Sequence, residues 1–129
     1  MTKSMARIRA LRPEFVETIP ETLDPGVLYI SVRYATASHL CACGCGQEVV
    51  TPIRPTDWSL TWNGESVALR PSIGNWALPC RSHYWVREGG RIEWAPAWSK
   101  KMVREAGRAV IAEKRTYFAK KPRGGSRTR

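Results

Sequence analysis

The cysteines and histidines of this chain have the residue types and the spacing of a metal site. They form a run with period two and, about 35 residues further on, a Cys-x-x-His pair: His39, Cys41, Cys43, Cys45, Cys80 and His83. Alternate side chains of an extended segment point the same way, so the run gathers its ligands around one point. Thiolate and imidazole ligands suit tetrahedral Zn²⁺, and two chelating pairs at this separation are typical of a zinc ribbon. The sequence therefore predicts zinc binding.

Six candidate ligands compete for about four coordination positions, and the sequence leaves open which of them bind. A closed structural site takes four protein ligands, whereas a catalytic site takes three and a water whose pKa falls to about 7. Our predicted ligand set is Cys41, Cys43, Cys45, Cys80 and His83. His39 is then spare and becomes a candidate general base. Buried free cysteines are the alternative, but they do not explain the clustering of all six residues.

A hydrolytic zinc site would also need a proton carrier and a group that stabilises the oxyanion. Glu17, Glu21 and Glu48 are the candidate carboxylates, and we expect Glu17 to carry the proton. Ser72 and Asn75, in a Gly-containing segment, are candidate hydrogen-bond donors. Each has a simpler alternative, because an isolated Glu is usually solvated and Ser or Asn often only shapes a turn. The sequence has no Gly-rich phosphate loop, serine nucleophile elbow or His-Glu-x-x-His helix.

The length and composition of the chain are those of a small intracellular domain. The 129 residues fit one domain with tails. No apolar run reaches the roughly 18 residues of a membrane span, and the first residues lack a hydrophobic signal core. We therefore expect a cytoplasmic protein that does not bind membranes. In that reducing compartment cysteines more often bind metal than form disulfides.

The net charge of +10 is concentrated at the two ends of the chain. Residues 100–129 hold eleven Lys and Arg against two Glu, a net of +9, and residues 1–12 add four basic residues. Residues 13–99 are mildly acidic, with six basic against nine acidic residues. A basic tail of this kind predicts nonspecific nucleic-acid binding or an acidic partner. The alternative is a solvated tail.

The hydropathy pattern predicts an α+β fold: a small, mostly antiparallel β domain stapled by zinc, followed by a C-terminal helix. Asn63-Gly64 between two alternating runs is a strong hairpin signal. Strands or extended segments are expected at 14–20, 27–34, 48–51, 57–62, 66–70, 83–87 and 91–94, with a loop at 71–76. The expected organisation is a flexible basic arm at 1–12, a zinc-binding domain at 13–98, an amphipathic helix at 99–119 and a disordered basic tail at 120–129.

Most of the chain from Phe15 to Trp98 resembles a family of small bacterial proteins. The resemblance is carried by the segments FVETIPETLDPGVLYIS, ATASHLCACGCGQEVVTP, PTDWSLTW, RPSIGNWALPCRSHYWV and IEWA. These cover roughly two-thirds of the chain; residues 1–12 and those from about 99 onward lie outside the pattern. The six Cys and His positions, Glu17 and Glu21, and Ser72 and Asn75 all fall within the matching segments.

The resemblance implies a role in a bacterial ubiquitination-like pathway. Members of the family are encoded beside relatives of ubiquitin-activating enzymes, ubiquitin-conjugating enzymes and ubiquitin-like proteins. They occupy the place where related operons carry a zinc-dependent deubiquitinase-like peptidase. The implied activity is a zinc peptidase or esterase that matures a ubiquitin-like protein or removes it from targets. The implied partners are the ubiquitin-like protein and its E1-like and E2-like enzymes.

Three functions follow from these observations. The first is a metallohydrolase in which zinc activates water, Glu17 moves the proton and Ser72 or Asn75 holds the oxyanion. The second is a non-catalytic zinc adaptor of the same conjugation machinery. The third, which rests only on the basic tail, is a nucleic-acid-binding zinc protein. A metal site with an open coordination position favours the first, and four strong ligands favour the second.

Overall fold

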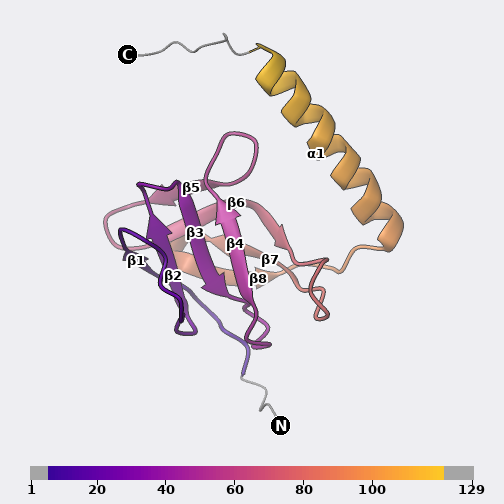
Figure 1. The fold of residues 1–129 in the computed structure, drawn as a ribbon. Helices are drawn as coiled ribbons and strands as arrows, with labels where there is room; N and C mark the ends of the chain where they lie inside the picture. Colours follow the sequence, from indigo (N-terminus) through magenta and orange to yellow (C-terminus); the bar gives the residue numbers. More distant parts are fainter. Residues whose placement is uncertain (1–5, 121–129) are drawn as a thin grey trace. The chain divides into compact units, whose positions relative to one another are not determined.

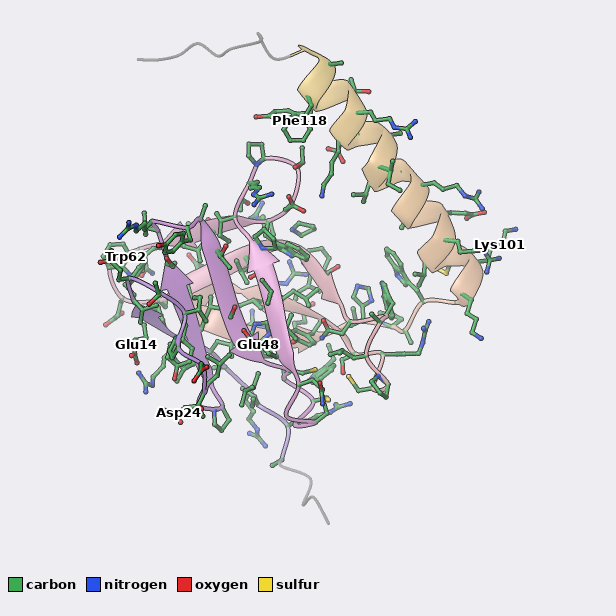
Figure 2. All side chains as sticks on the ribbon, viewed as in Figure 1. Glu14, Asp24, Glu48, Trp62, Lys101 and Phe118 are labelled. Carbon is green, nitrogen blue, oxygen red and sulfur yellow. The ribbon has the colours of Figure 1, made fainter. Side chains whose placement is uncertain are left out.

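The computed structural model describes residues 6–120, and the chain divides into two compact units between Ala97 and Trp98. The first unit carries the strands and one short 3-10 turn, Glu88–Gly90; the second carries one helix, α1 (Lys100–Lys120). Figure 2 shows Lys101 near the start of this helix and Phe118 near its end. The predicted α+β fold class, a mostly antiparallel β domain with a C-terminal helix, is confirmed.

The first sheet has the strand order β1-β2-β3-β4. Its strands are β1 (Arg12–Phe15), β2 (Val27–Ser31), β3 (Thr36–Leu40) and β4 (Glu48–Pro52). β1 runs parallel to β2, and the other two pairs are antiparallel. Every residue of β2 is buried, because one face packs on the main core and Val27 and Tyr29 on the other face pack with Leu23. In this arrangement β4 is an edge strand.

The second sheet is antiparallel throughout and has the order β5-β6-β7-β8. Its strands are β5 (Ser59–Trp62), β6 (Val67–Gly74), β7 (His83–Arg87) and β8 (Arg91–Trp94). The predicted Asn-Gly hairpin joins β5 to β6: Asn63 Oδ1 accepts hydrogen bonds from the backbone N–H groups of Glu65 and Ser66 at 2.9 and 2.8 Å. Gly64 adopts the positive φ of +96° that such a turn requires.

The two sheets enclose one hydrophobic core, and Figure 1 shows them as two layers. The first sheet contributes Leu28, Ile30, Ala37 and Val49, and the second contributes Leu69, Ile73, Tyr84, Val86 and Ile92. Period-two alternation sends these side chains inward. The side chains that alternate with them on β6 and β7, including Ser72 and His83, belong to the opposite face of the second sheet.

Several strand bounds differ from the sequence prediction, as at β1, where Arg12–Phe15 replaces the segment expected at 14–20, and the largest differences concern β3 and β6. β3 was not predicted, because its residues Thr-Ala-Ser-His-Leu are mostly small or polar. β6 was expected to end at residue 70 but continues to Gly74. Pro71 lacks the N–H group that a ladder needs, so this segment resembles a loop in sequence. The strand accommodates Pro71 by an irregular register with β7 between Leu69 and Ile73.

The segment expected to form a flexible basic arm joins the first unit from Ile8 onward. The Ile8 N–H donates to the Ala42 carbonyl at 2.8 Å, and the Leu11 N–H donates to the Gly90 carbonyl at 2.8 Å. The Leu11 side chain is 1% exposed and belongs to the core. The predicted disordered tail lies outside the described residues from 121 onward. Among residues 6–120, no helix has both the length and the apolar character needed to cross a membrane.

Candidate active site

Ser72 and His83 form a hydrogen-bonded pair on adjacent strands. Ser72 Oγ lies 2.9 Å from His83 Nε2, although the two residues are 11 positions apart in the chain. The β6–β7 register sets Gly74 opposite His83, so Ser72 and His83 are near neighbours on one face of the sheet. A serine hydroxyl within hydrogen-bond reach of an imidazole is the arrangement of an activated nucleophile and its general base.

A backbone carbonyl fixes the proton position on His83. The Nδ1 atom lies 2.7 Å from the carbonyl oxygen of Pro96. A carbonyl oxygen only accepts hydrogen bonds, so Nδ1 carries the proton. In the neutral ring Nε2 is then unprotonated and accepts a hydrogen bond from the Ser72 hydroxyl. The three groups reproduce the nucleophile, base and orienting acceptor of a catalytic triad, with a carbonyl in place of a carboxylate.

Trp76 packs against the imidazole of His83. The two ring centroids are 5.1 Å apart with an interplanar angle of 61°. The indole also lies against Gly74, where an added Cβ would come within 2.8 Å of Cζ2 and closer still to Nε1. Glycine at position 74 therefore allows the indole to lie over the strand and to support the imidazole.

The thiols of Cys41, Cys43, Cys45 and Cys80 meet beside this pair, all within 4.8 Å of one another. The Cys41–Cys43, Cys41–Cys80 and Cys45–Cys80 sulfur separations are 3.5, 3.8 and 3.9 Å. Tetrahedral corners about 2.3 Å from a central zinc are about 3.8 Å apart. The four thiols can therefore hold a metal ion, and the donor set fits zinc.

Burial and the mutual proximity of the thiols shift their pKa values. Burial raises the pKa of Cys41, and it is the main cause that raises the pKa of Cys45 to about 12. At Cys43 burial acts in the same direction, but hydrogen bonds from Ser82 and the neighbouring thiols outweigh it and lower the pKa to about 7. Without a cation the cluster resists full ionisation, because four thiolates so close together repel one another.

The structure separates the predicted ligands and catalytic residues into different environments. His83 is not part of the four-thiol group that the described residues form, and its ring nitrogens face Ser72 and Pro96. His39 is fully buried, with Nε2 2.8 Å from Tyr84 Oη, and burial lowers its pKa to about 4. Glu17 is exposed and pairs with Arg33.

The remaining candidates also lie away from the Ser72 hydroxyl. Asn75 turns its amide inward, where Nδ2 donates to Cys41 Sγ at 3.4 Å and to Tyr84 Oη at 3.5 Å. Glu21 and Glu48 are exposed, and Figure 2 shows Glu48 on β4. Of the predicted catalytic residues, Ser72 is the one that the structure places in a hydrogen bond with His83.

A comparison with protein families identifies the family of the chain. Residues 15–95 match the family described as bacterial ubiquitination-like system serine protease (BubE). The chain belongs to the BubE family. No curated protein and no solved structure matches the chain. The predicted family, with its ubiquitin-like setting, is thereby confirmed.

The predicted catalytic type is wrong. BubE proteins are described as serine proteases, whereas the sequence prediction assigned the nucleophile to a zinc-bound water. The zinc type came from the resemblance, since related operons carry a zinc-dependent peptidase in the same place, and the predicted cysteine and histidine ligands agreed with it. A serine protease needs no catalytic metal.

The pairing of Ser72 with His83 was missed because residues 71–76 were predicted to be a loop. Ser72 was noticed only as a hydrogen-bond donor, and His83 only as a ligand. A usable signal was present: alternation of Leu69 and Ile73 with polar positions continues the strand through Pro71. Extending the strand would have brought Ser72 and His83 to neighbouring strands.

Proposed function

We propose that this chain is a serine protease that cleaves a ubiquitin-like protein from its precursor or from a conjugate. The hydrogen bond of 2.9 Å between Ser72 Oγ and His83 Nε2 carries the proposal. The family description supports both the serine type and the ubiquitination-like setting. The substrate bond is then the one that follows the C-terminal tail of the ubiquitin-like protein.

The geometry gives each group a role in acyl transfer. Ser72 Oγ attacks the scissile carbonyl carbon while His83 Nε2 takes the hydroxyl proton. The proton passes to the leaving nitrogen as the carbon–nitrogen bond breaks, which leaves an acyl ester on Ser72. Water then attacks the ester, with His83 again as base, and the tail leaves with a free carboxylate. The Pro96 carbonyl accepts the Nδ1 proton throughout and stabilises the imidazolium.

The four thiols would hold a structural Zn²⁺ close to the general base. The ligands are Cys41, Cys43, Cys45 and Cys80, whose sulfur separations fit a closed tetrahedral site. Ser82, between Cys80 and His83 in the chain, donates its hydroxyl to Cys80 Sγ at 3.1 Å. Fixing this segment therefore fixes the start of β7, where His83 lies. A bound zinc would cross-link these segments, and each proton transfer above is assigned to Ser72 and His83.

Labelling of the nucleophile tests the proposal. A fluorophosphonate probe should form a covalent adduct that peptide mass spectrometry assigns to Ser72. The purified protein should cleave the ubiquitin-like precursor of the same system, and Ser72→Ala should abolish both adduct formation and cleavage. Ser66→Ala, in the β5–β6 turn, is the matched control and should retain both. Cleavage by the Ser72→Ala protein would overturn the assignment.

A further inference from the structure

A pocket of about 230 Å³ lies beside His83, the proposed general base. His83 itself lines this pocket, together with Trp94 and the two alanines that flank Pro96, Ala95 and Ala97. The Pro96 carbonyl is the group that accepts the Nδ1 proton of His83, at 2.7 Å. The pocket therefore adjoins the residue that would move the proton.

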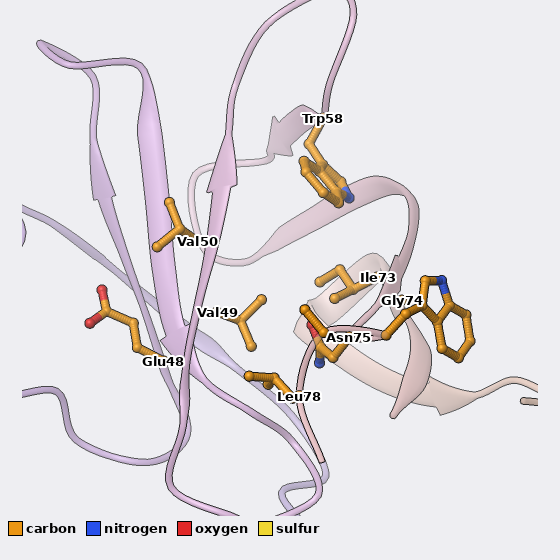
Figure 3. A pocket seen from close by; sticks show the side chains of 10 residues that line it. Glu48, Val49, Val50, Trp58, Ile73, Gly74, Asn75 and Leu78 are labelled. Atoms are coloured by element: carbon orange, nitrogen blue, oxygen red, sulfur yellow. The ribbon is translucent and has the colours of Figure 1, made fainter. Parts of the chain in front are cut away.

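Figure 3 shows another pocket, between β4 and the end of β6. Its lining includes Val49 and Ile73, whose side chains belong to the core between the sheets. Ser72 and His83 lie on the opposite face of the second sheet, and neither lines this pocket. Of the two pockets, the one beside His83 is therefore the one that a substrate bound at Ser72 can be expected to reach.

Two guanidinium groups border the pocket beside His83. Arg7 places its Cζ atom 4.0 Å from the centroid of the Trp94 ring. Arg81 places its Cζ atom 5.4 Å from the centroid of the Trp76 ring, and its Nη1 donates to the Trp76 carbonyl at 3.3 Å. Contact with a ring face orients a guanidinium without using its in-plane N–H donors. The two tryptophans therefore position two positive charges at one pocket.

The charge of this pocket contrasts with that of the surrounding domain. Residues 13–99 carry six basic against nine acidic residues, whereas no Asp or Glu is among the described residues that line the pocket. Within residues 6–120, Arg7 forms no ion pair with a carboxylate. Guanidinium groups bind carboxylates through paired, charge-assisted hydrogen bonds. The lining therefore fits a ligand that brings its own carboxylate.

The thiols of the candidate metal site are the other groups near these arginines that can carry negative charge. Cys43 and Cys80 line the same pocket, and four thiolates outweigh the charge of one Zn²⁺. Neutralising these thiolates is thus the competing role for Arg7 and Arg81. That role predicts that an arginine variant loses zinc. A role in substrate binding predicts that the variant keeps zinc and loses only a preference among substrates.

His83 also determines which part of a substrate lies nearest the pocket. In acyl transfer the base that takes the serine proton gives it to the leaving nitrogen, so that nitrogen must come within hydrogen-bond reach of His83. The first residues on the leaving-group side of the scissile bond therefore lie closest to the pocket. Its volume of about 230 Å³ is below the roughly 300–1,000 Å³ of most small-molecule sites, which suits a side chain.

We propose that the pocket beside His83 binds an acidic side chain on the leaving-group side of the scissile bond, and that Arg7 and Arg81 select it. The inference rests on the serine protease function proposed above and deepens it. In a precursor, the acidic residue would closely follow the C-terminal tail of the ubiquitin-like protein. In a conjugate, it would be a neighbour of the modified residue of the target.

Paired peptides test the charge preference. Each peptide carries the C-terminal sequence of the ubiquitin-like protein of the same system, a fluorophore and quencher at its ends, and Glu, Gln or Lys at both residues that follow the scissile bond. We expect the wild-type kcat/KM to be roughly tenfold or more higher for Glu than for Gln, and lowest for Lys. The preference should shrink as the salt concentration rises. Equal rates for the Glu and Gln peptides would overturn the inference.

Neutral variants of the two arginines assign the preference to the pocket. Arg7→Gln and Arg81→Gln should each slow cleavage of the Glu peptide and leave cleavage of the Gln peptide near the wild-type rate. Arg12→Gln is the matched control, because Arg12 is exposed on β1, pairs with Glu14 and does not line the pocket. It should keep the full preference for Glu. A preference that survives in both pocket variants would contradict the assignment.

Zinc content and fluorophosphonate labelling separate the remaining causes. We expect Arg7→Gln and Arg81→Gln to keep zinc and to label at Ser72 at the wild-type rate. Loss of zinc, with cleavage of the Glu and Gln peptides lowered equally, would show that the arginines serve the thiolates and would refute substrate selection. A wild-type protein that neither labels nor cleaves would overturn the protease function itself, whereas cleavage without a preference for Glu would overturn this inference alone.

Discussion

The indole of Trp76 lies in the space that a side chain at Gly74 would need. A Cβ at position 74 would be 2.8 Å from Trp76 Cζ2 and closer still to Nε1. The same indole contacts the imidazole of His83 edge to face at 5.1 Å between centroids. Gly74 therefore leaves room for the indole that lies against His83, the proposed general base.

Substitution of this glycine should impair catalysis more than folding. Gly74→Ala would displace the Trp76 indole and leave His83 without its lateral support. Because small displacements of a catalytic group can cost up to about 10²-fold in rate, we expect kcat to fall roughly tenfold or more. The measurement is steady-state cleavage of a fluorogenic amide of the C-terminal peptide of the ubiquitin-like protein from the same system. Thermal unfolding follows stability in parallel.

The double variant Gly74→Ala/Trp76→Ala shows whether the effect passes through the indole. With the indole absent, an alanine at position 74 meets no obstacle, so its additional effect should vanish relative to Trp76→Ala alone. An undiminished effect of Gly74→Ala in that background would show that the glycine acts by another route.

The two histidines of the chain should differ sharply when each is replaced. His83→Gln removes the base, and we expect kcat/KM to fall by about 10³-fold or more. Because the four thiols remain, zinc content should stay at the wild-type level by metal analysis. His39→Gln is the matched control; it perturbs a buried hydrogen bond to Tyr84 and should cost about 1–3 kcal/mol of stability. Loss of zinc in His83→Gln would make His83 a ligand after all.

Metal replacement should distinguish a structural from a catalytic ion. Cadmium and cobalt also accept tetrahedral thiolate sites, so either should restore the fold of the zinc-free protein. Because the metal takes no part in the proposed steps, kcat should stay within a fewfold of the zinc form. Chelation should instead lower the free energy of unfolding, which thermal or urea denaturation measures. A kcat that follows the identity of the metal would contradict the serine mechanism.

The sequence predicted those features that arise from local patterns. Alternating hydrophobicity and the Asn63-Gly64 turn were sufficient for the hairpins, and the cysteine spacing identified the thiol cluster. The pair of Ser72 and His83 was harder to predict, because it depends on the register of β6 against β7. A proline inside β6 hid that register, and the proximity of Cys80 to His83 favoured a chelating interpretation. The spacing of cysteines and histidines shows which residues could bind a metal. Only the pairing of β6 with β7 shows that His83 is hydrogen-bonded to Ser72 instead.

The N-terminal segment should be essential to the fold, even though its basic composition resembles that of a flexible arm. Leu11 is 1% exposed and packs in the core between the sheets. Leu11→Ala removes a buried side chain and leaves a cavity, so we expect the free energy of unfolding to fall by about 2–5 kcal/mol. Phe118→Ala is the control, because that larger side chain is 59% exposed on α1 and should change stability by at most about 0.5 kcal/mol. Equal effects of the two substitutions in urea denaturation would show that residues 6–12 do not complete the core.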